Sequence, residues 1–391
     1  MHARWLCFAA LAHGLNMTSP RAARERAYTS GLAYLACRQS GGSRPALVRL
    51  GAGGGFGSMF QLTARAFVDA LRGKQRGGYE PGAAEHGPVA FVGEWKFYTA
   101  NRACNSTGYE CHFLPLLQRR RGDASADACD EAFDPGAALR GPTFNSYWWW
   151  GVAQSYMLRP NPSLEAALAA ATARAGLARD PDIALHMRFG DKQHDPDSHQ
   201  PHAADARVTA EQYLELALGW ATARRDACAG LQRRGGGGAR RAEVWVATDS
   251  ASAAAAARAW GRTHADLVAV RMQSEGTSSL STLTRTLSGP KVEIALEGAK
   301  RRPAEQAALA TEVLVDLVLL SRATALAGLC MSQLSEIAAA VGFARGTLRD
   351  AVALDPVNIA RTNIWKYGAE EGWRAREAPS RAWRDHSDCG G

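Results

Sequence analysis

The sequence predicts an α/β protein of two domains, with a Rossmann-type parallel sheet in its C-terminal half. The chain has 391 residues and is 46% hydrophobic, enough for two buried cores. From residue 181 onward, short apolar runs alternate with helical patterns, as in parallel sheets that helices cover on both faces. Near the start, an apolar run at 45–50, a glycine-rich loop and an amphipathic pattern predict a strand–loop–helix unit.

The periodicity of apolar residues predicts the individual elements. Strands are expected at 45–50, Val89–Val92, Ile183–Met187, 242–247, 267–272 and 325–330. Helices are expected at 21–34, 60–71, 163–175, 210–224, 250–260, 304–320 and 332–341. Apart from the strand at Val89–Val92, residues 72–150 are expected to be irregular, because they are rich in glycine, proline and aromatic residues.

These elements predict four parts of the chain. Residues 1–30 form an N-terminal lead-in, 31–180 a first α/β domain with irregular loops, 181–345 the Rossmann-type domain, and 346–391 a C-terminal tail. An apolar stretch at 6–15 is too short to span a bilayer, which needs about 20 residues, so no membrane anchor is expected.

The composition argues against two classes of function. The net charge is +8, but the arginines are scattered and no basic tract is interleaved with aromatic residues, so nucleic-acid binding is disfavoured. None of the 8 cysteines forms a CxxC pair, which disfavours a zinc ribbon or a thioredoxin-like site. Asn105-Ser-Thr is a glycosylation sequon, which matters only in a secretory compartment.

The segment IALHMRFGDK at 183–192 is the most informative motif. A buried strand ends here in a turn, and ligands of open α/β sheets bind beyond the carboxyl ends of the strands. Arg188, Asp191 and Lys192 would therefore lie where an anionic ligand docks, since a guanidinium fork suits a phosphate. The alternative is a solvated loop that carries a surface ion pair.

Two further strand ends carry candidate ligand contacts. Gly55, Phe56 and Gly57 open a helix after a glycine-rich run, and exposed N–H groups at a helix start favour anions; a plain tight turn is the alternative. In VWVATDS at 244–250, the strand ends at Asp249 on the carboxyl edge of the sheet. The alternative for this segment is an ordinary helix N-cap.

Near the end of the predicted sheet, two features point to a nucleotide. Asp316 lies in an otherwise apolar helix, and a buried carboxylate needs a partner. A guanine base or a nearby arginine would each provide one. Ser332 and Gln333 follow a strand and begin a helix, which makes a second N-terminus that favours an anion.

Taken in order, these motifs are more specific than any one of them. They are GGFGSMFQ, FNSYWWWGVAQSYMLRPNP, HMRFGDK, VWVATDS and VDLVLLSRATALAGLCMSQ. Their order and spacing over about residues 31–340 resemble the α-1,6-fucosyltransferase family that acts on the N-glycan core, and more broadly the α-1,2- and protein O-fucosyltransferases. The tail at 346–391 leaves no room for the SH3-like domain of that family.

The resemblance implies a GT-B-like pair of α/β domains and GDP-fucose as the donor substrate, without a cofactor or a metal ion. Arg188 matches an arginine that binds the donor diphosphate, and Asp316 matches a base-recognising aspartate. The other donor-binding residues that the resemblance implies are His186, Asp249, Ser332, Gln333, Tyr213, Gly55, Phe56 and Gly57. Phe189 stands where the family has a second arginine.

The resemblance places the catalytic residues after the strand at Ile183–Met187. Arg188, Asp191 and Lys192 match the family pattern, whereas Pro196 stands where the family has a glutamate. Inverting sugar transfer needs a carboxylate to take the acceptor proton. Asp195 and Asp197 flank that position, so either is a candidate general base; the alternative is that both are ordinary loop residues.

The resemblance also implies a disulfide, partners and a compartment. Cys37 and Cys104 match a family disulfide, with Cys104–Cys111 as the competing local pair. The expected activity is fucose transfer with inversion, α-1,6 to the innermost GlcNAc of N-glycans, in the Golgi lumen or membrane. The partners would be GDP-fucose and a glycan or glycoprotein acceptor, with a homodimer left open. The alternatives are an α-1,2 or protein O-linked fucosyltransferase, or a non-catalytic relative that binds a GDP-sugar or a glycan.

Overall fold

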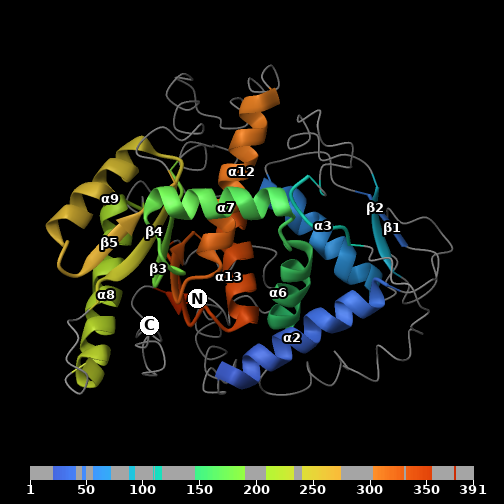
Figure 1. Ribbon diagram of the computed structural model, residues 1–391, viewed down its shortest axis with the longest axis horizontal. Helices are drawn as coiled ribbons and strands as arrows, with labels where there is room; N and C mark the ends of the chain where they lie inside the picture. The colour runs from blue at the N-terminus through green and yellow to red at the C-terminus, as the bar shows by residue number, and fades with distance from the viewer. Residues whose placement is uncertain are drawn as a thin grey trace, which may run out of the picture.

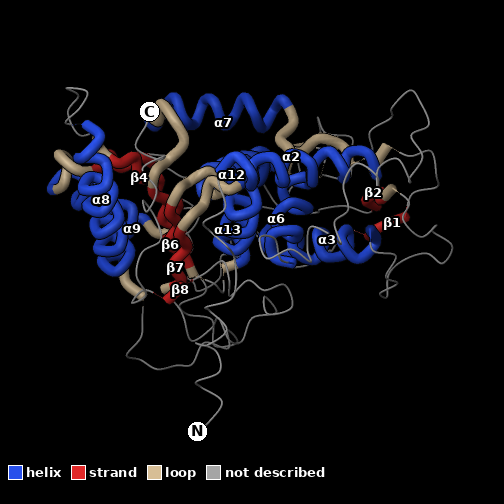
Figure 2. Tube along the Cα trace, turned by 90° about the horizontal axis from the view of Figure 1, so that it is seen from below, coloured by secondary structure: helices blue, strands red, loops and turns tan. Residues whose placement is uncertain are grey.

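A computed structural model of the chain places its elements in successive layers. It describes residues 21–40, 46–49, 56–71, 88–92, 109, 111–116, 146–189, 208–232, 240–273, 303–329, 332–354 and 374–375. From left to right, Figure 1 shows a layer of helices, the main sheet, a central layer of helices, a further helical layer and a small sheet. Figure 2 shows the same order from below.

The main sheet has six parallel strands in the order β5-β4-β3-β6-β7-β8. This is the doubly wound order, in which the chain starts in the middle of the sheet, builds one half and then returns to build the other. The order reverses between β3 and β6. The strands are β3 (Ile183–Met187), β4 (Ala242–Thr248), β5 (Val268–Arg271), β6 (Ala325–Gly328), β7 (Asp350–Ala353) and β8 (Arg374–Ala375).

Both faces of this sheet are buried, because successive side chains of a strand point to opposite faces. On β3, Ile183, Leu185 and Met187 pack on one side with the helices α8 and α9. Ala184 joins the core on the other side, which holds α12 and α13. The helices are α8 (Ala210–Gln232), α9 (Ala251–Thr263), α12 (Pro303–Leu320) and α13 (Gln333–Arg345).

The N-terminal part packs on the outer side of α13 (Figure 1). A two-stranded parallel sheet pairs β1 with β2, and α3 contacts both strands. Gly151 of α6 lies so close to α13 that a Cβ there would be 2.0 Å from the carbonyl oxygen of Ala340. The elements are α2 (Arg21–Arg38), β1 (Ala46–Arg49), α3 (Phe56–Leu71), β2 (Val89–Val92), α6 (Ser146–Met157) and α7 (Pro162–Ala175).

The predicted α/β class, with its parallel sheet in the C-terminal half, is confirmed. Two features differ from the expected elements. The aromatic end of the segment expected to be irregular begins the helix α6, in which Trp148, Trp149 and Trp150 are all buried. The expected tail at 346–391 supplies β7 and β8 to the main sheet. Among the described residues, no helix is long and apolar enough to cross a membrane.

A buried ionic cluster fixes the amino end of the sheet. Asp182, directly before β3, accepts two hydrogen bonds from Arg179, at 2.8 and 2.5 Å, and pairs with Nε of Arg224 at 3.2 Å. Its carboxylate also accepts a hydrogen bond from the backbone N–H of Glu243 on β4, at 2.8 Å. One buried carboxylate therefore connects β3, β4 and α8 at this end of the sheet.

Replacing Asp182 by alanine leaves the Arg224 guanidinium buried without this partner. We expect Asp182→Ala to lower the free energy of unfolding by about 3 kcal/mol, measured by urea denaturation. Asp226→Ala is the control, because Asp226 is exposed and its ion pair with the neighbouring Arg225 is exposed as well, so a change within about 0.5 kcal/mol is expected. Equal effects of the two substitutions would contradict the anchoring role of Asp182.

Candidate functional site

The carboxyl ends of β3 and β4 are joined by an ion pair. Nη1 of Arg188 lies 2.5 Å from Oδ2 of Asp249, and the backbone N–H of Phe189 donates to Oδ1 of Asp249 at 2.8 Å. The Asp249 side chain is 2% exposed, whereas 20% of the Arg188 side chain remains exposed. The buried Asp249 therefore orients the guanidinium of Arg188. The exposed part of the Arg188 side chain can bind a ligand.

His186 bridges the two strands between which the strand order reverses. It lies on β3, and its Nδ1 is 2.6 Å from Oγ of Ser335 and 3.5 Å from Oγ of Ser332, both of which follow β6. Burial, reinforced by the nearby Arg188 charge, lowers the pKa of His186 to about 3. The imidazole is therefore neutral at ordinary pH and acts as a hydrogen-bonding group.

The N-terminal turns of α3 and α13 lie side by side. A Cβ on Gly57 would be 2.9 Å from Cβ of Gln333 and 3.3 Å from the backbone nitrogen of Leu334. Only glycine allows this approach without a shift of one helix. Phe56 is the first residue of α3, so the predicted Phe56–Gly57 and Ser332–Gln333 segments meet at two neighbouring helix starts.

Asp316 contacts the face of the sheet from α12. Its Oδ1 accepts a hydrogen bond from Nε1 of Trp245 at 3.1 Å, and Gln273 also donates to its carboxyl group. Burial raises the pKa of Asp316 from 3.8 to about 7, although these hydrogen bonds counteract the increase. The partners that the sequence required are therefore an indole and an amide of the protein itself.

Tyr213 of α8 supports the segment after β3. Tyr213 is fully buried, and its ring meets that of Phe189 edge to face, with the ring centroids 6.1 Å apart. Phe189, which stands where the resembled family has an arginine, thus packs partly buried against the core of α8.

Several predicted residues lie outside the described part of the chain. They are Gly55, Cys104, Asn105, Asp191, Lys192, Asp195 and Asp197. Cys37, Cys111 and Cys228 are each disulfide-bonded, and the pairing of Cys37 with Cys104 stays a prediction. The proposed general base likewise stays a prediction of the sequence.

The structure adds three residues that were not among the predicted site residues, namely Ser335, Gln61 and Glu336. Ser335 holds His186, and Nε2 of Gln61 donates to Oε2 of Glu336 at 3.1 Å. Glu336 is 4% exposed, and burial raises its pKa to about 7. Ser335 and Glu336 lie three and four residues after the predicted Ser332, so helical spacing from Ser332 was the signal that could have found them.

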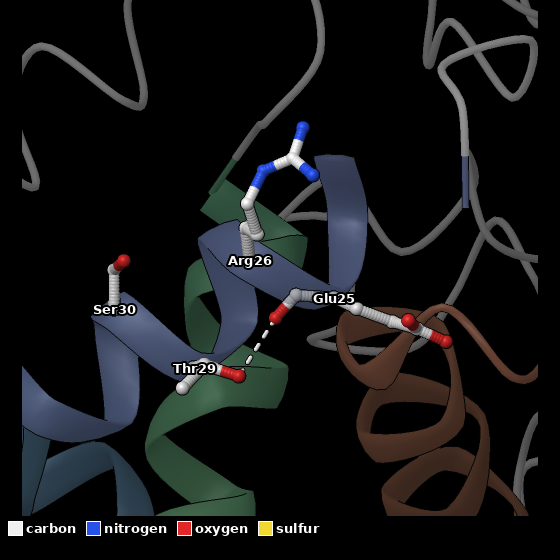
Figure 3. Close-up of a pocket in the computed structure, with 4 residues that line it drawn as sticks. All are labelled: Glu25, Arg26, Thr29 and Ser30. Carbon is white, nitrogen blue, oxygen red and sulfur yellow. Dashed lines mark hydrogen bonds between the residues drawn. The ribbon is translucent and has the colours of Figure 1, made fainter. Parts of the chain in front are cut away.

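Together, these groups suit an anionic ligand that carries several hydrogen-bonding groups. Arg188 offers a charge, Ser332 a hydroxyl, and α13 an N-terminus that favours negative charge. Among the described residues, no group of three or more His, Cys, Asp or Glu side chains could hold a metal ion. The open depression in Figure 3 lies on α2 and shares no residue with this site; its lining residues are Glu25, Arg26, Thr29 and Ser30.

The fold and these contacts define an α/β protein with a polar site at the carboxyl edge of a doubly wound sheet. No protein-family model matches the chain, and no curated protein sequence matches it. Among solved structures, it is similar to the fucosyltransferase NodZ from Bradyrhizobium, with 13% identity and a TM-score of 0.37 over 80% of this chain and 97% of that one. A structure of the NodZ alpha-1,6-fucosyltransferase soaked with GDP-fucose has 13% identity and a TM-score of 0.34, over 76% of this chain and 93% of that one. Since these TM-scores lie under 0.5, the likeness carries no weight for the function of this chain.

The raised pKa of Asp316 makes the stability depend on pH. The folded state holds this proton more tightly than the unfolded state. The contribution of Asp316 to the free energy of unfolding is therefore largest below about pH 4 and is lost as the pH rises through about 7. Asparagine keeps an oxygen for Trp245 and carries no charge. We therefore expect the melting temperature of Asp316→Asn, relative to that of the unsubstituted protein, to rise by about 2 °C or more between pH values of about 5 and 8.

Asp180→Asn serves as the control, because the Asp180 side chain is 56% exposed and its ion pair with Arg322 is long, at 3.5 Å. Its melting temperature relative to the unsubstituted protein should stay level over the same pH range. If the difference for Asp316→Asn also stayed constant with pH, the raised pKa of Asp316 would be contradicted.

Proposed function

We propose that the chain is a glycosyltransferase that binds a nucleoside diphosphate sugar where the order of the main sheet reverses. One observation carries the proposal: His186 of β3 contacts Ser332 and Ser335 after β6, directly across the reversal. Ligands of doubly wound sheets bind outside the carboxyl ends of the strands at this point, and their phosphates favour a helix N-terminus. Arg188, oriented by Asp249, adds the positive charge.

The proposed reaction is an inverting transfer. The acceptor hydroxyl oxygen attacks the anomeric carbon as the bond from that carbon to the diphosphate oxygen breaks, and the electron pair leaves with the diphosphate. Arg188 and the α13 N-terminus stabilise this developing negative charge, so the reaction draws on no cofactor. The hydroxyl proton passes to a carboxylate, for which Asp195 and Asp197 are the candidates in the sequence.

The donor and acceptor are proposed from the order of the sequence motifs. HMRFGDK, VWVATDS and the Asp316 to Gln333 segment resemble the fucosyltransferase motifs, which favours GDP-fucose as the donor. We propose α-1,6 transfer to the innermost GlcNAc of N-glycans, in the Golgi, as the first linkage to test. Transfer to an α-1,2 position or to a protein hydroxyl is the next, because GGFGSMFQ also resembles the α-1,2 loop.

A specific observation favours one second candidate, a non-catalytic protein that binds a GDP-sugar. Phe189 stands at the position of the second family arginine, and its ring packs against Tyr213. The diphosphate would then be held by one guanidinium where the resembled family uses two. Saturable binding of GDP-fucose without hydrolysis or transfer would favour this candidate.

Removal of the Arg188 guanidinium tests the diphosphate role. A hydrogen bond to a charged group is worth about 1.5–3 kcal/mol, so we expect Arg188→Ala to raise the dissociation constant for GDP about 10- to 100-fold in calorimetric titration. Turnover of GDP-fucose should fall at least as much. Arg188→Lys keeps the charge against Asp249 but loses the fork, and an intermediate affinity is expected.

Arg262→Ala is the matched control, since Arg262 is an exposed arginine at the end of α9. This change should leave GDP affinity within about two-fold. Unchanged affinity in both Arg188 variants, with folding verified by circular dichroism, would contradict the proposed site. So would a failure of the unsubstituted protein to bind GDP at all.

A further inference from the structure

Glu336 is a buried carboxyl group in the first turns of α13, next to the proposed phosphate-binding residues. It directly follows Ser335, which contacts His186, and it lies three residues after Gln333. Its Oε2 accepts a hydrogen bond from Nε2 of Gln61 on α3, at 3.1 Å. This hydrogen bond connects the N-terminal part of the protein to the helix that follows β6.

The Gln61–Glu336 contact lies about one helical turn C-terminal to the close approach of Gly57 to Gln333. Gln61 follows Gly57 by four residues on α3, and Glu336 follows Gln333 by three on α13, so each pair lies on one helix face. The two helices therefore run in the same direction, with their N-terminal turns side by side. The polar contact is placed to hold this arrangement.

A third helix, α6, packs against α13 near the level of Glu336. On α6, the ring of Tyr147 contacts that of Phe343, and Gly151 contacts Ala340, so α6 and α13 run antiparallel. Gln154 lies seven residues after Tyr147, and Glu336 seven residues before Phe343, so the helical repeat brings them to the same level. Gln154 is fully buried, and its amide has no hydrogen-bond partner among the described residues.

Burial in this environment favours the uncharged form of Glu336. The pKa of its carboxyl is raised to about 7, and the hydrogen bond from Gln61 counteracts only part of the effect of burial. The nearby imidazole of His186 is neutral as well. A neutral carboxyl beside a diphosphate avoids the repulsion that a carboxylate would cause, and an amide of the same shape should replace it.

We propose that Glu336 is a positioning residue that, through Gln61, holds the N-terminal turn of α3 against that of α13. Both helix starts then act on the same diphosphate, although neither side chain has to touch it. This inference rests on the proposed function, because it assigns a role within the same nucleotide site. Loss of the bridge should weaken GDP binding while Arg188, Asp249 and His186 remain in place.

The test compares four variants by calorimetric titration with GDP. Because a hydrogen bond is worth about 1 kcal/mol, Gln61→Ala and Glu336→Ala should each raise the dissociation constant about five-fold. The double variant should lose no more affinity than either single variant, because both changes remove the same contact. Glu336→Gln, which keeps the acceptor oxygen, should restore affinity to within about two-fold.

Trp220→Phe is the matched control for a merely structural effect. Nε1 of Trp220 donates to Asp350 at 2.9 Å in a buried contact at the amino end of β7, on the opposite edge of the sheet. This change should lower the melting temperature and leave GDP affinity unchanged. If Glu336→Ala fails to fold, Gln61→Ala, which changes a partly exposed residue, still decides the question.

The outcomes separate the two proposals. Unchanged GDP affinity in Gln61→Ala, additive losses in the double variant, or no rescue by Glu336→Gln would overturn the positioning role while GDP binding itself stands. Absence of any GDP binding by the unsubstituted protein would overturn the proposed function and the positioning role together.

Discussion

A buried hydrogen bond between His186 and Ser335 joins the two halves of the main sheet where its strand order reverses. It forms because β3 and β6 are neighbours whose carboxyl ends share one edge, and because α13 starts directly after β6. The neutral imidazole needs a polar partner in this buried position, since an unpaired polar group there is costly. This contact links the start of α13, where Ser332 and Gln333 lie, to the carboxyl end of β3.

Around that contact, two carboxyl groups perform different tasks because their surroundings differ. Asp249 faces a guanidinium and a backbone N–H, and orients Arg188 toward the edge of the sheet. Glu336 accepts a hydrogen bond from an amide, and burial raises its pKa to about 7. The first group positions a charge for a ligand, whereas the second, whose raised pKa disfavours the charged form, connects two helix starts.

Periodicity could predict the elements from residue 181 to 345, because strands buried on both faces read as continuous apolar runs and the helices between them are long. The strand-end residues Arg188 and Asp249 followed from the rule that parallel strands share a carboxyl edge. α6 escaped prediction because it is buried on all sides and has no polar face. The contact of Gln61 with Glu336 spans 275 residues, so only the packing of α3 on α13 could reveal it.

The central claim is that a nucleoside diphosphate binds where the strand order reverses, against the start of α13. A crystal structure of the protein soaked with GDP tests it most directly. The account predicts electron density for the diphosphate between the carboxyl ends of β3 and β6, within hydrogen-bonding distance of Arg188 and Ser332. Density for GDP at another surface, or none at a saturating concentration, would contradict the account.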